Sequence, residues 1–177
     1  GVSYNHQDYY IATLISRLFD DGVTSRLQKI LREEKGLVYS VECRTTSLPD
    51  TGTIDFDVSV RAEKVVEVAE ILFDEIEKFV LTGVSEDELG LVKKRYGYDL
   101  DYELDDPYRQ IIRHGFCHLY STEFTLEEER EKISQITPHD ILKVARDIFV
   151  PEKLNFVLVG PYTPDLKSSL NSLVQSF

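Results

Sequence analysis

The chain of 177 residues has the length of one ordinary domain. Apolar residues make up 42% and charged residues 29%, which are usual values for a globular fold and argue against disorder. Acidic residues outnumber basic ones by 32 to 20, and the net charge of −12 excludes a surface for nucleic acid or anionic membrane, because both need clustered Lys and Arg.

Two helices are predicted at the start of the chain. Residues 8–19 carry apolar side chains at helical spacing, and a second helix with Leu27 and Leu31 on its inner face follows. Gly36 suits the left-handed position that comes after the end of a helix. We therefore expect a sharp change of direction at Gly36.

A β-hairpin is predicted next. Residues 37–43 and 54–60 alternate apolar and polar side chains around a loop that contains Pro and Gly. Strict alternation puts Tyr39 on the same face as Val41 and Cys43, where a core tyrosine would lie.

Helices predominate after the hairpin. Apolar spacing, capping residues and Pro at first helical positions predict helices over residues 63–82, 86–100, 107–119, from 126, over 138–148 and from 164. In the third of these, the apolar side chains are expected to face inward: Tyr108, Ile111, Ile112, Phe116 and Leu119. Residues 154–160 have apolar side chains on both sides, which predicts an interior strand.

These elements indicate an α/β fold of the α+β type, with a mostly antiparallel sheet and helices packed on one of its faces. Three strands form a thin sheet for so many helices, so we expect a further strand upstream of residue 1. Methionine is absent, so residues 1–177 are expected to be a processed product or a fragment of a longer protein, and their length fits a single domain. No signal peptide or long apolar run is visible, which favours a cytoplasmic location and no membrane partner.

The sequence contains no catalytic motif of its own. Gly-rich phosphate loops, the nucleophile elbow and the zinc motifs H-E-x-x-H and H-x-x-E-H are absent. His114 and His118 have the spacing of a chelating pair, but no carboxylate lies between them and Gly115 weakens the helix. His118 shares a stripe with Ile111 at the border of the core, which favours a hydrogen-bonded structural histidine. We therefore expect no metal and no cofactor in this chain.

Residues 18–41 carry the most specific pattern. S-R-L occupies residues 25–27, after a turn with one glycine, and L-R-E-E-K-G-L-V-Y-S-V occupies residues 31–41. I-T-P-H-D-I-L-K-V-A at 136–145 and L-N-F-V-L-V-G-P at 154–161 follow in order. The series resembles the carboxy-terminal, non-zinc domain of the pitrilysin, insulysin and mitochondrial-processing-peptidase family over nearly the whole chain. Relatives often have two or three glycines before S-R-L, so no function is assigned to that turn.

The resemblance implies a two-lobed zinc metallopeptidase that closes around an unfolded peptide. In the family, zinc is held by H-x-x-E-H and a distant Glu in an amino-terminal domain. A zinc-bearing domain or subunit is therefore the implied partner, and this chain alone is expected to be inactive. Arg32 and Tyr39 match an Arg and a Tyr that grip the peptide and help to stabilise the reacting carbonyl. A guanidinium fork suits peptide carbonyls, and a phenol can donate to an oxyanion.

Structural interpretations of the same residues remain open. Tyr39 fits a core position, Arg32 suits a helix C-terminus for dipole reasons alone, and Arg26 is expected to be a structural anchor. With the resemblance added, we favour substrate binding by Arg32 and Tyr39. The alternative is a non-catalytic scaffold or assembly subunit, a role in which the family's fold also occurs, as in a respiratory complex. Whether two copies form a homo-oligomer stays open.

Overall fold

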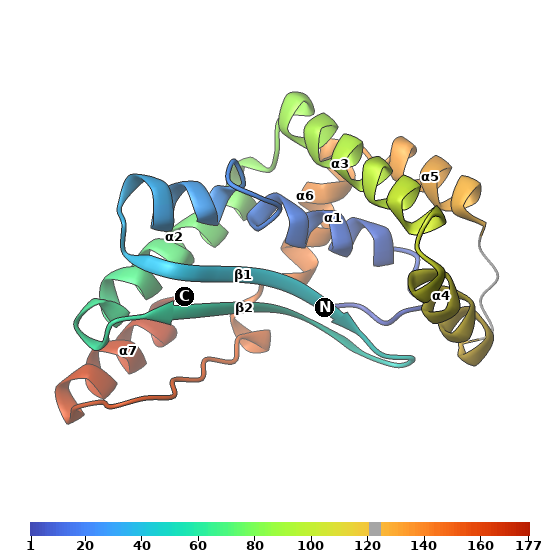
Figure 1. Ribbon diagram of the computed structural model, residues 1–177. Coiled ribbons are helices and arrows are strands. Elements are labelled where there is room, and N and C mark those ends of the chain that lie inside the picture. The colour runs from blue at the N-terminus through green and yellow to red at the C-terminus, as the bar shows by residue number, and fades with distance from the viewer. Residues whose placement is uncertain (121–124) are drawn as a thin grey trace.

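The computed structural model describes residues 1–120 and 125–177, and its centre is a long antiparallel hairpin (Figure 1). Strand β1 (Val38–Ser47) pairs with strand β2 (Gly52–Val60) in a two-stranded sheet. The backbone N–H of Leu48 donates to the carbonyl of Thr51 (2.8 Å) and closes the connecting loop. The predicted hairpin is confirmed.

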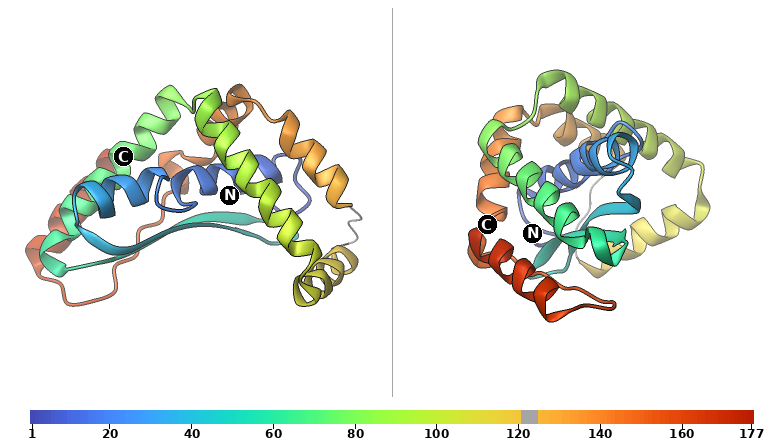
Figure 2. Two further views of the ribbon diagram at one scale, coloured as in Figure 1. Left: turned by 45° about the horizontal axis from the view of Figure 1, so that its top comes forward. Right: turned by 90° about the vertical axis from the view of Figure 1, so that its left-hand side faces the viewer.

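The helices form a second layer on one side of this hairpin (Figure 2). They are α1 (Tyr9–Phe19), the π-helix η1 (Gln28–Glu34), α2 (Val65–Thr82), α3 (Glu86–Leu104), α4 (Pro107–Leu119), α5 (Leu126–Gln135), α6 (Pro138–Ile148) and α7 (Pro164–Ser176), with short 3₁₀ turns η2 (Ala62–Lys64) and η3 (Pro151–Lys153). The α+β class with an antiparallel sheet is therefore confirmed. Within the described residues, no helix is both long and apolar enough to cross a bilayer.

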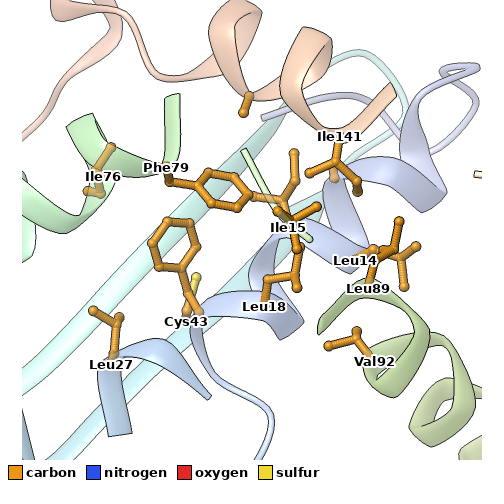
Figure 3. Close-up of a cluster of buried hydrophobic side chains, with 14 of the residues drawn as sticks. Leu14, Ile15, Leu18, Leu27, Cys43, Ile76, Phe79, Leu89, Val92 and Ile141 are labelled. Atoms are coloured by element: carbon orange, nitrogen blue, oxygen red, sulfur yellow. The ribbon is translucent and has the colours of Figure 1, made fainter. Parts of the chain in front are cut away.

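Helix α1 forms the middle of the core because both of its sides are covered. Its residues Leu14, Ile15 and Leu18 are fully buried among side chains of α2, α3 and α6 (Figure 3). The ring of Phe19 lies 5.2 Å from that of Phe56 on β2 and 4.9 Å from that of Phe79 on α2. Each buried side chain of this size contributes about 1.5–3 kcal/mol, so α1 holds the two layers together.

Side-chain caps fix several helix starts as predicted. Thr137 and Asp140 form a reciprocal capping box at α6, and Thr125 forms one with Glu128 at α5. At α3 the Ser85 hydroxyl accepts from the N–H of Glu88, while among the described residues the Glu88 carboxylate binds Arg26 and gives no return bond to Ser85.

The predicted interior strand at residues 154–160 is wrong for this structure. The segment is extended but belongs to no sheet in the described part of the chain, and Val157 and Val159 are exposed. Its apolar alternation is real, but a strand also needs a neighbour with which to share hydrogen bonds.

The predicted inward stripe of α4 is also wrong. Tyr108, Ile111 and Leu119 are all strongly exposed, and none of the helix is buried. His114 and His118 are exposed too, so His118 does not border the core as expected. Periodicity identified an amphipathic helix correctly, but it did not reveal whether anything covers the apolar side.

Candidate functional site

The candidate site is the corner between η1 and β1, residues 28–41, which contains both Arg32 and Tyr39. An ordinary α-helix was expected before Gly36, but the helix is of the wider π type. The N–H of Lys35 donates to the carbonyl of Ile30 (3.2 Å), five residues earlier. Gly36 has the positive φ of 60° that was predicted for it, and its N–H donates to the carbonyl of Arg32 (3.1 Å).

Arg32 lies on the outer side of η1. Its neighbour Leu31 is fully buried in the core, so the chain turns the next side chain toward solvent. The Arg32 side chain is 50% exposed, and its Nε lies 3.7 Å from the Glu33 carboxylate. An exposed pair of this kind holds the guanidinium weakly, and its remaining N–H groups stay available as donors.

Tyr39 is the extra residue of a β-bulge. Val38 pairs with Val60 and Ser40 pairs with Ser59, so β1 advances by two residues where β2 advances by one. The bulge shifts the alternation of β1, which buries Val38 and Val41 and leaves Tyr39 89% exposed. The placement of Tyr39 on the core face, expected from strict alternation, is therefore wrong.

Hydrogen bonds tie the corner to α1. The Asp20 carboxylate at the end of α1 accepts from the Gln28 side chain (3.1 Å) and from the N–H of Cys43 (3.2 Å). The same Gln28 amide donates to the carbonyl of Val41 (2.9 Å). Sequence reasoning missed Asp20 and Gln28, because their contacts join residues that are 8 to 23 positions apart.

Arg26 is an anchor, as expected, and not a free ligand-binding group. It donates two hydrogen bonds to Glu88 (2.7 and 2.8 Å), one to Glu75 (3.2 Å) and one to the carbonyl of Gly83 (3.1 Å). Its guanidinium carbon also lies 4.8 Å from the centre of the Phe79 ring. Burial by itself would lower the pKa of Arg26, but the bonds and charges of Glu88 and Glu75 offset this and raise it. The start of η1 is thereby fixed to α2 and α3.

Metal ligands are not gathered in the part of the chain that the structure describes. Among the described residues, no three His, Cys, Asp or Glu side chains lie close enough to hold an ion. The donor set therefore does not fit zinc, and no step of a reaction is assigned to a metal here. Besides the exposed Lys29 and Lys35, the corner presents a guanidinium and a phenol as hydrogen-bond donors, on a surface whose backbone is firmly held.

Comparisons with known proteins agree with this organisation. An uncharacterised zinc protease from Streptomyces coelicolor is 25% identical over 175 residues, and the match covers 98% of this chain but 38% of that protein. The chain thus spans less than two-fifths of the length of this relative.

Solved structures share the fold. The peptidase M16 inactive domain from Pseudomonas fluorescens superposes with a TM-score of 0.74 at 20% identity, over 85% of this chain and 36% of that one. A chain of complex III2 from Candida albicans gives a TM-score of 0.72 at 19% identity, over 82% and 37% respectively. Residues 1–96, more than half of the 177, match the family described as peptidase M16 inactive domain, so this chain belongs to that family and the resemblance found in residues 18–41 is confirmed.

Proposed function

We propose that this chain is the substrate-binding, non-zinc domain of a zinc-dependent metallopeptidase. The zinc and its ligands belong to a separate domain or subunit, and the peptide substrate lies between the two. The chain is inactive alone, and the full protein hydrolyses peptide bonds. A cytoplasmic location remains a prediction from the sequence, and the pairing of two copies stays open.

The main support is the exposure of Arg32 and Tyr39 at one corner. A phenol in the core could not reach a substrate, whereas the bulge turns this one outward. In the described part of the chain, the Tyr39 hydroxyl has no recorded hydrogen-bond partner, so no internal contact has to break before it donates to a substrate. The Arg32 guanidinium can take two carbonyl oxygens of an extended peptide with its planar fork of N–H groups.

The role of each residue follows from when its contact forms. Arg32 binds carbonyl groups of the resting peptide and therefore contributes mainly to KM. Tyr39 donates to the oxygen that becomes negative as the carbonyl reacts, so its contribution appears in kcat. Loss of one such donor costs about 3 kcal/mol in transition-state stabilisation, or roughly a hundredfold in rate.

The test uses the full-length protein with its zinc-bearing partner. We expect Arg32→Ala to raise KM for an unstructured peptide and Tyr39→Phe to lower kcat about a hundredfold, with zinc content and folding unchanged. Arg109→Ala and Tyr108→Phe are matched controls, because both residues are exposed on α4, away from the corner (Figure 1). If the corner variants cleave peptide as fast as the controls do, Arg32 and Tyr39 have no such role.

A scaffold role is the second candidate. The specific observation in its favour is the shared fold with a chain of complex III2 from Candida albicans. A scaffold subunit needs neither zinc nor turnover, so a full-length protein that binds no zinc and cleaves no peptide, but co-purifies in a stable assembly, would favour it. Zinc binding together with peptide cleavage would exclude it.

A further inference from the structure

Residues 154–160 have every feature of a strand except a partner. The ring centre of Phe156, a residue that is 37% exposed, lies 6.3 Å from that of Phe73, and Leu158 packs on a small cluster made by α2 and α7. The side chains of Val157 and Val159 alternate with these and are 82% and 92% exposed. Among the described residues, no backbone hydrogen bond is recorded for positions 155–160.

Strand β2 has a free edge of its own. In the described part of the chain it pairs with β1 on one side only, and its inward side chains Ile54, Phe56 and Val58 are only partly buried. An isolated two-stranded hairpin is marginal, and an open edge presents a row of unpaired N–H and C=O groups. The outer edge of β2 and the segment 154–160 thus both carry backbone N–H and C=O groups that lack hydrogen-bond partners among the described residues.

Strand β2 and residues 154–160 run in the same direction. Val60 at the end of β2 and Leu158 near the end of the segment pack on the same cluster of Val65, Ala69 and Leu170. In Figure 1 the segment passes along β2 on the side opposite β1.

The N-terminus lies close to the first residues of both β2 and the segment 154–160. A Cβ on Gly1 would clash with the backbone N of Thr53, and one on Gly52 would clash with the carbonyl oxygen of Val2. The backbone nitrogen of Gly1 is partly buried and lies near the charged side chains of Lys153 and Asp55. Gly1 is therefore close to the first residues of β2 and to Lys153, which directly precedes the segment.

We propose that the residues directly before Gly1 in the longer polypeptide form a strand that inserts between β2 and residues 154–160. The strand ends at Gly1, where its two neighbours begin, so it runs antiparallel to both. A strand of about seven residues would be long enough to pair with the whole of residues 154–160. The resulting order is β1, β2, the inserted strand and residues 154–160, and the inference does not depend on the role proposed for Arg32 and Tyr39.

The inserted strand changes how the domain is joined to the rest of the protein. A sheet strand hydrogen-bonded on both sides cannot move as a flexible linker does, because each shift of register breaks the whole ladder. The chain therefore enters this domain along a fixed path through the sheet. Other candidates for the same space are a second copy of the domain or a separate extended peptide, and the test distinguishes them.

Cysteine cross-linking in the full-length protein identifies the neighbour. We start from Cys117→Ser, add Val159→Cys, and change each of the eight residues before Gly1 to Cys in turn. Cross-strand cysteines can form a disulfide when their Cβ atoms lie about 3.5–4.5 Å apart. We expect one or two positions to give an intramolecular disulfide with Val159→Cys. Val23→Cys, at a position that is also exposed (64%, against 92% for Val159) but lies in the turn after α1, should give none. No cross-link at any position, or only disulfide-linked dimers, would overturn the proposal.

Hydrogen exchange provides an independent measurement that needs no substitution. In the full-length protein, alternate amides of residues 155–159, and those amides of β2 that point away from β1, should exchange at least about 100-fold more slowly than unstructured peptide. Exchange of residues 155–159 at the rate of an unstructured peptide would show that the segment has no strand neighbour, and the proposal would fail.

Discussion

Replacing Arg26 by Met should destabilise the domain strongly, because this one side chain joins three elements. The substitution removes four hydrogen bonds, to Glu88, Glu75 and the carbonyl of Gly83, while the methionine keeps an apolar contact with the Phe79 ring. The Arg26 side chain is only 15% exposed, and Glu75 is more buried still. Loss of the cation therefore leaves a carboxylate with little water to replace its partner.

The magnitude follows from how completely the partners are buried. Breaking a fully buried ion pair by removing one member costs about 3–5 kcal/mol. Glu88 is 32% exposed and can be rehydrated, and Lys78 remains 3.6 Å from Glu75, so both reduce the loss. We expect the free energy of unfolding to fall by about 2–3 kcal/mol for Arg26→Met. Arg26→Lys keeps the positive charge but loses the planar set of guanidinium N–H donors, and should lower the free energy of unfolding by about 1 kcal/mol.

Urea-dependent hydrogen exchange, followed by mass spectrometry of peptides from α2 and α3, measures this free energy inside the full-length protein. The matched control is Arg109→Met, which removes an exposed pair with Asp106 and should change the free energy by less than about 1 kcal/mol. A double-mutant cycle with Glu88→Gln should give a coupling energy of about 1–2 kcal/mol. If Arg26→Met and Arg109→Met are equally stable, the anchoring role of Arg26 is refuted.

Two further predictions concern backbone strain and alkaline pH. Gly36→Ala should lower the free energy of unfolding by about 1 kcal/mol, because the φ of 60° at this position disfavours a residue with a Cβ. The cost is one of backbone strain alone, since no atom lies within 4 Å of the position that the Cβ would occupy. Gly115→Ala in α4 is the control and should be neutral or stabilising in the same unfolding measurement. Burial raises the pKa of Tyr9 to about 12, above its ordinary value of 10, so the unfolded chain loses this proton first. The contribution of Tyr9 to stability should therefore be fully present below pH 10 and decline from about pH 10 to 12. The decline in melting temperature should be shallower in Tyr9→Phe. A melting temperature that does not change over this range would contradict the raised pKa of Tyr9.

Local patterns in the sequence predicted what local interactions determine. The capping box of Thr137 and Asp140 lies within four consecutive residues, and Gly36 needs only its own backbone preference, so both were found correctly. The hairpin was found for the same reason, since its turn and its alternation lie within about two dozen residues. These features depend little on what surrounds them.

Features that depend on distant partners were not predicted. The bulge at Tyr39 exists because β2 pairs with β1 in a particular register, and its only trace in the sequence is the three-residue step between the buried Val38 and Val41. The apolar face of α4 and the segment 154–160 were both assigned to the interior. Apolar spacing shows which side of an element avoids water, but it does not supply the neighbour that covers that side.

The π-helix and the bulge act together on the candidate site. Each irregularity adds a residue to a regular element, one before Gly36 and one after it. Leu31 and Val38 remain buried, and the residues that directly follow them, Arg32 and Tyr39, are turned outward. A regular strand with the same residues would return Tyr39 to the core face and leave Arg32 exposed without the phenol beside it. The two donors are thus presented together because both elements depart from regular geometry, and buried neighbours hold each donor in place.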